Sequence, residues 1–453
     1  MTVELCGARL LSPIYGTSLY VWSSVMAITL AGLAAGYFLG AFFSQKKDTS
    51  KILLNVLFSA GIFISLIPFL AYYIVPRISY FNFNLAVLLS SGILLFIPIV
   101  ALGCTSPLFI KQLASDTDAG KFSGMVYGIS TVGGILSTLI SGFYIIPAFG
   151  FNTTILAFGI ILVLTCIITF KKINVWLLIV FVFTNYMSFQ INPKSKSSLF
   201  RKESLNGTIE VTEERTGNSV SRILSINNII QTEYNLTNKV SSSKYLKIIE
   251  SEILKDSTRG NVLILGLGGG VLCNMLVENG FDVTGVEFDE RIINCSRNYF
   301  NLNPNVKVIE DDARNFINNN KEVYQYIIFD LFKSEECPAH TVTLESFELV
   351  KKQLTANGKL FINWHGYYSG KEGLGTLTLL NTLSAAGFEV NLKSTDKLQA
   401  HSNLVWIAKP SKNVSAISSL PINFDNYQLL EKQNALASLQ WRKNYLNYYQ
   451  GKN

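Results

Sequence analysis

The residues of this chain that could do chemistry begin at a glycine-rich loop in its second half. The apolar run 261–265 is typical of a buried parallel strand, and the glycines after it let the backbone approach a ligand because they carry no Cβ. Glu287 stands twenty-one residues after Gly266, where a carboxylate can accept hydrogen bonds from both hydroxyls of a ribose. The pattern predicts an adenosine site, whose loop glycines are Gly266, Gly268 and Gly270.

A dinucleotide is the weaker interpretation of this loop. The pattern G-x-G-x-x-G needs glycine or alanine at position 271, where the chain has Val271. The clustered glycines 268–270 suit a wider turn under a methionine-derived tail. The sequence therefore favours an adenosyl compound that carries such a tail over NAD.

Two further acidic positions follow predicted strands. Asp311 and Asp312 come after the apolar segment 306–309, where carboxylates can hold the exocyclic amine of an adenine. The alternative is that both acids only cap the helix that begins near Ala313. Asp330 ends the predicted strand 326–330, and the ligand crevice of an open parallel sheet lies outside the carboxyl ends of its strands. Asp330 is therefore expected at the reactive end of the ligand.

Residues from about 203 to 408 resemble the polyamine aminopropyltransferases, the spermidine synthase family, and in particular its membrane-fused, synthase-like branch. The matching stretches are 203–211, 222–231, 266–270, 286–287, 312–314 and 330–347, with 8–22 and 127–134 in the N-terminal half. The resemblance implies that Glu287 binds the ribose, that Asp312 binds the adenine and that Asp330 assists the attacking amine. Gln231 matches a glutamine of the second hairpin, which we assign to the cofactor site.

The implied reaction transfers the aminopropyl group of decarboxylated S-adenosylmethionine to an amine such as putrescine. A sulfonium activates the adjacent carbon, so the protein must mainly align a neutral amine and remove or redirect a proton, and Asp330 can do both. Glu335 or Glu336 would attract the distal ammonium of a diamine. His340 is expected either to relay a proton or to cap or pack its loop.

Two departures from the family pattern keep other functions open. Soluble spermidine synthases carry Asp-x-x-Asp-Pro at the catalytic strand, whereas Lys333 stands three residues after Asp330. They also carry Tyr-His-Glu where this chain has Ser242 to Leu246. The alternatives are a methyltransferase-like enzyme that uses S-adenosylmethionine itself, and a non-catalytic membrane sensor with an adenosyl-thioether-binding domain. Retention of Glu287, Asp312 and Asp330 favours a transferase.

The first 190 residues carry most of the hydrophobicity of a chain that is 49% hydrophobic and 15% charged, with a mean hydropathy of +0.31. A spanning helix needs about 20 apolar residues. We expect five spanning helices and a marginal sixth, which contains Asn185 and could lie in the interface or pack against the soluble domain. The windows are 18–43, 52–75, 84–104, 122–147, 152–170 and, for the sixth, 174–190.

Basic residues predict the orientation of these helices, because loops rich in lysine and arginine stay in the cytoplasm. The loops so marked carry Lys46, Lys47 and Lys51, then Lys111 and Lys121, then Lys171 and Lys172. A sixth crossing would place the enzyme domain outside, although its donor is made in the cytosol. We therefore expect a multi-pass protein of the cell membrane with a cytoplasmic catalytic domain. Either the last window does not fully cross the membrane, or a helix before Met1 changes the number of crossings by one.

The expected architecture is an N-terminal α-helical transmembrane bundle followed by a Rossmann-like α/β domain of the AdoMet methyltransferase type, with a small β-hairpin unit in front. The boundaries are 1–190 for the bundle, 191–202 for a linker, 203–239 for the β unit, 240–410 for the Rossmann-like domain and 411–453 for a helical tail. Small residues at four-residue spacing predict close helix packing, at Gly32, Gly36 and Gly40, at Gly124 and Gly128, and at Ser130 and Gly134.

The cysteines and the net charge limit which metals and partners are expected. The six cysteines are scattered without a C-x-x-C pair or a histidine at metal spacing, so neither a metal site nor a disulfide framework is predicted. The net charge of +7 is expected to come mostly from loops beside the membrane, and it does not indicate nucleic acid. The expected partners are a small-molecule amine and the lipid bilayer, and a homo-oligomer remains open.

Overall fold

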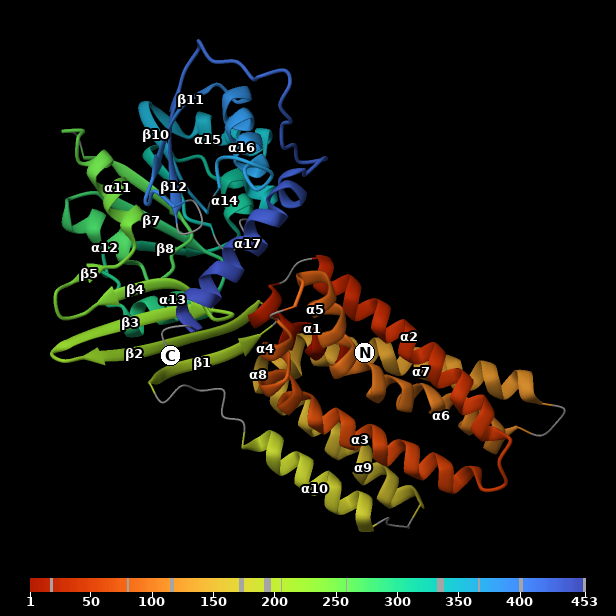
Figure 1. Cartoon of the computed structure of the whole chain (residues 1–453). Helices are drawn as coiled ribbons and strands as arrows, with labels where there is room; N and C mark the ends of the chain where they lie inside the picture. The colour runs from red at the N-terminus through yellow and green to blue at the C-terminus, as the bar shows by residue number, and fades with distance from the viewer. Residues whose placement is uncertain are drawn as a thin grey trace. The chain divides into compact units, whose positions relative to one another are not determined.

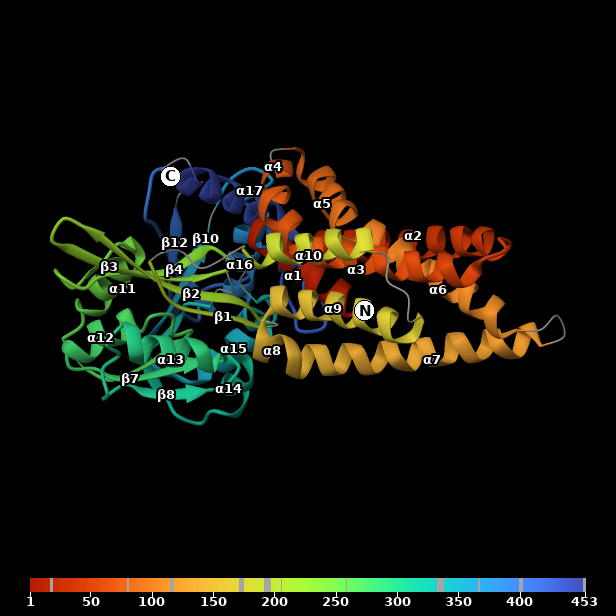
Figure 2. The same cartoon turned by 90° about the horizontal axis from the view of Figure 1, so that it is seen from below.

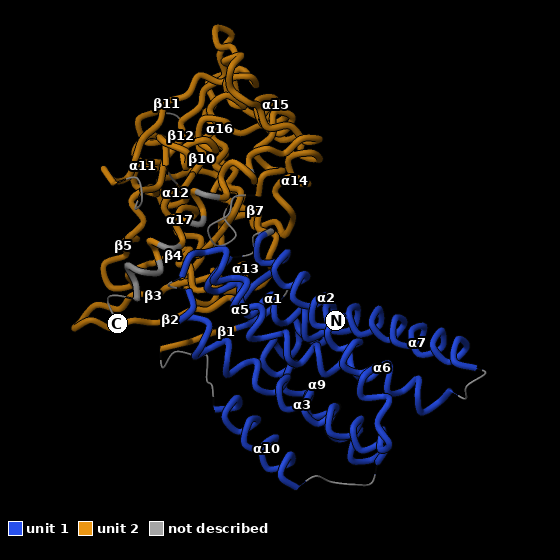
Figure 3. The backbone as a smooth tube through the Cα atoms, turned by 45° about the vertical axis from the view of Figure 1, so that its right-hand side comes forward, with its two compact units in different colours: residues 1–195, 202–208 blue, residues 196–201, 209–453 orange. Residues whose placement is uncertain are grey.

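The computed structural model describes residues 1–16, 19–79, 81–114, 118–170, 175–190, 197–204, 206–257, 259–331, 338–365, 367–398 and 402–450. The chain forms two compact units, one of residues 1–195 and 202–208 and the other of residues 196–201 and 209–453 (Figure 3). The first unit is helical, and the second is built around β-sheets.

The helical unit contains long helices (Figure 1 and Figure 2), most of which are apolar. Its elements are α1 (Thr2–Tyr15), α2 (Leu19–Ser44), α3 (Thr49–Tyr73), α4 (Val75–Ile78), α5 (Phe83–Ser91), the π-helical turn η1 (Gly92–Phe96), α6 (Ile97–Leu113), α7 (Ala119–Ile140), the π-helical turn η2 (Ser141–Ile145), α8 (Ile146–Phe149), α9 (Phe151–Phe170) and α10 (Val175–Phe189). Within the described residues, five helical stretches are long and apolar enough to cross a membrane: Tyr20–Ser44, Thr49–Tyr73, Phe83–Leu113, Ala119–Phe149 and Phe151–Phe170. This confirms the prediction of five long apolar helices followed by a shorter one.

The two predicted glycine stripes behave differently. On α2, a Cβ at Gly36 would lie 2.5 Å from the carbonyl oxygen of Val100, and one at Gly40 would lie 2.6 Å from that of Cys104, so α2 and α6 approach backbone to backbone. This stripe packs as predicted. On α7, a Cβ at Gly124 or Gly128 would meet no described atom within 4 Å, so the predicted packing at these two glycines is wrong within this chain.

Helix α10 packs on α3, and it does not lie apart from the bundle. Phe181 of α10 joins an apolar cluster with Phe58 of α3 and Val163 of α9. Further along, the Ser188 hydroxyl donates a hydrogen bond of 2.6 Å to the carbonyl oxygen of Ser65. The length of α10, fifteen residues, did not predict this contact with α3.

The second unit begins with an antiparallel sheet in the order β1-β2-β3-β4-β5. Its strands are β1 (Ser198–Ser204), β2 (Gly207–Thr216), β3 (Ser219–Ile226), β4 (Ile229–Asn235) and β5 (Val240–Ser241). β4 matters most for the site because it carries Gln231 and Thr232.

The larger sheet has seven strands in the order β11-β12-β10-β9-β6-β7-β8, and β10, β9, β6, β7 and β8 are parallel. The strands are β6 (Asn261–Leu265), β7 (Asp282–Glu287), β8 (Lys307–Glu310), β9 (Tyr324–Phe329), β10 (Leu354–His365), β11 (Phe388–Ser394) and β12 (Asn403–Pro410). The helices are α11 (Lys244–Ile253), α12 (Val271–Glu278), α13 (Glu290–Tyr299), α14 (Ala313–Asn319), the 3-10 turn η3 (Ala339–Thr341), α15 (Leu344–Lys352), α16 (Leu374–Ala385) and α17 (Leu430–Gln450). This is the predicted Rossmann-like fold.

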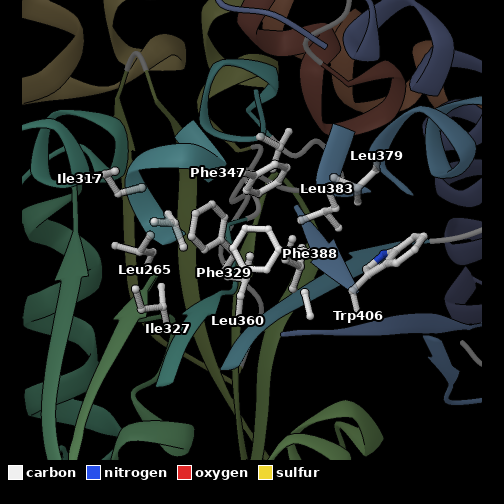
Figure 4. Close-up of a cluster of buried hydrophobic side chains, with 14 of the residues drawn as sticks. Leu265, Ile317, Ile327, Phe329, Phe347, Leu360, Leu379, Leu383, Phe388 and Trp406 are labelled. Carbon is white, nitrogen blue, oxygen red and sulfur yellow. The ribbon is translucent and has the colours of Figure 1, made fainter. Parts of the chain in front are cut away.

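Apolar residues cover both faces of this sheet, which explains why its strands are continuous hydrophobic runs. On one face Leu265, Ile327 and Phe329 pack with Phe347 of α15 and Leu383 of α16 (Figure 4). The alternate residues of the same strands, among them Ile264, Tyr326 and Ile328, form a second cluster with α11 and α12 on the other face. The strand order reverses between β6 and β9, and ligands of such sheets bind outside the carboxyl ends of the strands at that reversal.

Candidate functional site

The glycine loop joins β6 to α12 at the reversal of the strand order. Gly266, Gly268 and Gly270 have φ angles of 92°, 51° and 74°, a conformation that L side chains rarely adopt. A Cβ on Gly266 would collide with the carbonyl oxygen of Asp330, so only glycine lets β6 and β9 run this close. The backbone conformation of the loop therefore explains why glycines stand there.

Glu287 ends β7 and is buried, with 7% of its surface exposed. One carboxylate oxygen accepts a hydrogen bond from the Leu267 amide at 3.1 Å, and the other accepts one from the Asp289 amide at 3.1 Å. Burial raises the pKa of Glu287 to about 7, against the opposing effect of these backbone amides. Each oxygen keeps a further lone pair, which a ribose hydroxyl could use.

Asp311 and Asp312 follow β8, and the capping role weighed against adenine binding is visible in the structure. One Asp312 oxygen accepts hydrogen bonds from the amides of Arg314 at 2.9 Å and Asn315 at 3.0 Å, at the start of α14. Asp311 accepts from the Asp312 amide and from the Asn315 side chain, both at 2.8 Å. The second Asp312 oxygen lies 3.7 Å from Nε2 of His340, so His340 is placed beside this acid.

Asp330 follows β9 directly, and side chains from two other elements hold its carboxylate. The Tyr245 hydroxyl of α11 donates to Oδ2 at 2.8 Å, and Nδ2 of Asn363 in β10 donates to Oδ1 at 2.7 Å. Burial raises the pKa of Asp330, and these two hydrogen bonds oppose the rise. Burial and the charge of Asp330 in turn raise the pKa of Tyr245 well above 10. Tyr245 therefore stays a hydrogen-bond donor at neutral pH.

The strand β4 reaches the glycine loop through a residue that sequence analysis missed. Oγ1 of Thr232 accepts a hydrogen bond of 2.9 Å from the Gly269 amide. Its neighbour Gln231, which was assigned to the site, donates to the carbonyl oxygen of Ile229 at 3.3 Å. The fold thus places β4 beside the loop, with Thr232 in direct contact.

Tyr245 and Asn363 were also missed, and each left a trace in the sequence. Asn363 is the one polar residue in the apolar segment 360–364, near the end of β10. Tyr245 lies in the segment 242–246, which departs from the Tyr-His-Glu of the family.

Two predicted acceptor-binding residues, Glu335 and Glu336, lie outside the described residues. Across the part of the chain that the structure describes, no group of three His, Cys, Asp or Glu side chains could hold a metal ion. The described candidate groups are thus a glycine loop, the carboxylates Glu287, Asp311, Asp312 and Asp330, and the hydroxyls of Thr232 and Tyr245.

Comparisons with known proteins found matches within this unit. Residues 247–368 match the family model of the spermine/spermidine synthase domain. The chain is 30% identical over 128 residues to a polyamine aminopropyltransferase from Vibrio vulnificus, covering 26% of this chain and 42% of that protein. It is 32% identical over 111 residues to an N-terminal histidine N-methyltransferase from Emericella nidulans, covering 23% of this chain and 20% of that protein. The chain thus spans less than half the length of these two curated relatives.

A solved structure, of a probable spermidine synthase from Corynebacterium glutamicum, is 19% identical with a TM-score of 0.41 and matches 48% of this chain and 80% of that one. The family-model match is confined to residues 247–368, which contain the glycine loop, Glu287 and Asp330. The match confirms, for this part of the chain, the resemblance found in the sequence.

Proposed function

We propose that this protein is a membrane-anchored aminopropyltransferase, which transfers the aminopropyl group of decarboxylated S-adenosylmethionine to a polyamine such as putrescine. One observation carries the proposal. Asp330 follows β9 directly, with its backbone against Gly266 of the glycine loop and its carboxylate oriented by Tyr245 and Asn363, in a segment that matches the spermine/spermidine synthase family model.

The donor would lie across the carboxyl ends of β6, β7 and β8. Glu287 would accept hydrogen bonds from the ribose, Asp311 or Asp312 would bind the adenine amine, and the glycine loop would pass under the sulfonium tail. The acceptor nitrogen would then attack the carbon next to the sulfonium, and the breaking bond would leave its electron pair on sulfur. Asp330 would orient the amine and take the proton that the new C–N bond makes acidic.

The charge of Asp330 favours the decarboxylated donor. S-adenosylmethionine carries a carboxylate on the tail that would approach Asp330, and two like charges in a partly buried site repel each other. The decarboxylated tail ends in an amine and avoids this cost. The second candidate function, a methyltransferase that uses S-adenosylmethionine, is favoured by the similarity to the histidine N-methyltransferase.

Calorimetry with the full chain in detergent distinguishes the two donors through their by-products. Methylthioadenosine is left by aminopropyl transfer, and S-adenosylhomocysteine is left by methyl transfer. We expect methylthioadenosine to bind at least tenfold more tightly. Tighter binding of S-adenosylhomocysteine would favour the methyltransferase, and binding of neither compound would contradict both functions.

The apolar helices support an anchoring role. The five long stretches have mean hydropathies of 1.7 to 2.6, and many of their large side chains are exposed, including Phe38, Ile129 and Phe143. In water such surfaces would aggregate, whereas in a bilayer lipid covers them. We expect the full chain to resist carbonate extraction from membranes, and its recovery in the soluble fraction would contradict the anchor.

The basic residues of the helical unit and the origin of the donor predict opposite sides of the membrane for the catalytic unit. Gln112 of α6 donates a 3.3 Å hydrogen bond to Ser50 of α3, so the lysine-bearing ends of α2, α3 and α6 meet at one end of the bundle. α10 starts at that end, because Leu177 packs near Leu54, and it runs toward the other. The positive-inside rule alone would then send the chain after α10 out of the cytoplasm.

We propose a cytoplasmic catalytic unit nevertheless, since the donor is made there and since Lys194, Lys196, Arg201 and Lys202 follow α10. The test labels single cysteines, introduced at Asn218 in an exposed hairpin and at Lys47, with an impermeant maleimide in intact cells. A cytoplasmic unit leaves position 218 unlabelled until the cells are opened. Labelling of position 218 in intact cells would reverse the assignment.

A further inference from the structure

We propose that Asn403 is a positioning residue for the acceptor site, which orients the Asn363 amide so that its nitrogen faces Asp330. The inference rests on the proposed function, because it concerns the carboxylate that would receive the proton of the acceptor amine. It adds a residue that touches neither donor nor acceptor in that scheme and that acts through its neighbour.

The observation is a chain of three side-chain hydrogen bonds. Nδ2 of Asn403 donates to Oδ1 of Asn363 at 2.9 Å, and Nδ2 of Asn363 donates to Oδ1 of Asp330 at 2.7 Å. Tyr245 closes the chain at the other oxygen of Asp330, at 2.8 Å. Every donor in this series points toward the Asp330 carboxylate. Asn403, Asn363 and Asp330 lie at the ends of three adjacent strands, β12, β10 and β9.

The direction of these hydrogen bonds matters because a side-chain amide has a donor end and an acceptor end. Asn363 can present either a donor or an acceptor to Asp330, since its NH₂ group and its oxygen exchange places by a rotation of half a turn. A donor stabilises the ionised carboxylate, whereas an oxygen facing Asp330 would stabilise only its protonated form. Asn403 selects between the two, because its NH₂ group needs the oxygen of Asn363 as a partner.

The backbone of Asn403 is fixed well enough to impose this choice. Its amide donates to Oγ1 of Thr395 at 2.8 Å, and its carbonyl oxygen accepts from the Thr395 amide at 2.9 Å. Asn363 is itself buried, with 3% of its surface exposed. A buried amide that lost its partner would have to find another or turn, because an unsatisfied polar group is costly in such a place.

Two other titratable groups face Asp330, and the pKa of each is raised well above neutrality. Tyr245 faces it from α11 with a pKa well above 10, and Cys273 faces it from α12 with a pKa that burial raises to about 12. His365 lies two residues beyond Asn363 and stacks on Trp441 at 4.2 Å between ring centroids. At the surface Lys244 pairs with Asp396 at 3.3 Å. Each of these groups is kept in the variants below.

The test is a double-mutant cycle on the full chain with Asn363→Ala, Asn403→Ala and the double variant. The readout is the carboxyl C=O infrared band of Asp330, isolated by subtracting the spectrum of Asp330→Asn, which also removes any contribution from His365. Loss of one hydrogen bond to a charged group is expected to raise the midpoint in Asn363→Ala by about one to two pH units. Asn403→Ala should raise it by roughly half as much.

The decisive result is the double variant. If Asn403 acts through Asn363, the double variant titrates like Asn363→Ala, so the two shifts do not add. Additive shifts, or a lower melting temperature in Asn403→Ala with an unmoved midpoint, would show a merely structural role and overturn the inference. Asn391→Ala, an exposed asparagine on the neighbouring strand β11, is the matched control and should leave the midpoint unchanged.

This readout does not depend on turnover, so it separates the inference from the proposed function. An unmoved band in an active enzyme refutes only the role of Asn403. A shifted band in a protein that transfers no aminopropyl group refutes only the proposed function. Where the enzyme is active, the acid limb of kcat/KM in Asn403→Ala should move to higher pH by the same amount as the band, because Asp330 must be ionised to accept a proton.

Discussion

Two carboxylates at the carboxyl edge of the same sheet are held in different ways. On the proposed donor side, Glu287 is fixed by the backbone amides of Leu267 and Asp289. On the proposed acceptor side, Asp330 is fixed by the side chains of Tyr245 and Asn363. Burial raises the pKa of both acids, so the difference lies in their partners.

This difference explains where the chain departs from the family pattern. A backbone amide is present whatever the residue, so substitutions around Glu287 leave its hydrogen bonds in place. The partners of Asp330 are side chains that a single substitution can replace. One of the two departures noted in the sequence, the segment 242–246, contains Tyr245, which holds the Asp330 carboxylate. We infer that the donor chemistry follows from the fold and that the acceptor preference is set by individual side chains.

The largest expected effect is on the acceptor side. Asp330→Asn keeps the shape but removes the negative charge, and general-base effects typically supply about a hundredfold to ten-thousandfold in rate. We expect turnover to fall by that factor while methylthioadenosine affinity stays within about threefold, measured on one preparation. Asp282→Asn, at the exposed amino end of β7, is the control. Unchanged turnover in Asp330→Asn would remove this residue from the mechanism.

The next effect concerns pH and the donor side. The pKa of Glu287 is raised from 4.5 to about 7, so the folded protein without ligand binds a proton that the unfolded chain releases near its ordinary pKa. The free energy of unfolding should therefore fall as pH rises from about 4.5 to about 7, by up to roughly 3 kcal/mol. Glu287→Gln should lose this dependence, which melting temperatures across the range would show. Equal slopes in parent and variant would contradict the buried-acid account.

Removing the donor-side carboxylate should weaken donor binding with a smaller effect on saturated turnover. Glu287→Ala loses charged hydrogen bonds to the ribose, which we expect to cost about 1.5–3 kcal/mol of methylthioadenosine affinity. Glu290→Ala, an exposed acid three residues further on, is the matched control. Equal affinity in Glu287→Ala and the parent, measured by calorimetry, would withdraw the ribose assignment.

The smallest effect tests whether the antiparallel sheet supports the glycine loop. Thr232→Val keeps the volume but removes the acceptor of the Gly269 amide, so donor affinity should fall by about 1 kcal/mol, roughly fivefold. Thr237→Val removes a similar acceptor, that of the Val220 amide, from the same sheet away from the loop. If both variants lose affinity equally, the effect comes from the stability of the sheet and not from the loop contact.

The donor side could be predicted from the sequence because its signals are local. Apolar runs locate the strands, and Gly266, Glu287 and Asp330 stand where those runs end. The partners of Asp330 could not be predicted in this way, because Tyr245 lies 85 residues away and Asn363 lies 33 residues away along the chain. Only the pairing of β9 with β10 and the packing of α11 bring them together.

The helical unit shows the same limit. Small-residue spacing is a local pattern, and it does not say whether a partner helix is present. The stripe with Gly36 meets α6, whereas a Cβ at Gly124 would lie within 4 Å of no described atom outside its own helix. The length of the last apolar window likewise did not reveal that Ser188 would bond to Ser65 of α3. Local sequence patterns predicted the helices, whereas the helices that they pack against were seen only in the structure.

The most direct test of the central claim is product analysis with the full chain in lipid nanodiscs. The protein would be incubated with putrescine and either decarboxylated S-adenosylmethionine or S-adenosylmethionine, and the products would be identified by mass spectrometry. We predict methylthioadenosine and an aminopropylated diamine from the decarboxylated donor alone, both abolished by Asp330→Asn. Formation of S-adenosylhomocysteine and a methylated amine, or aminopropyl transfer that survives Asp330→Asn, would contradict the account.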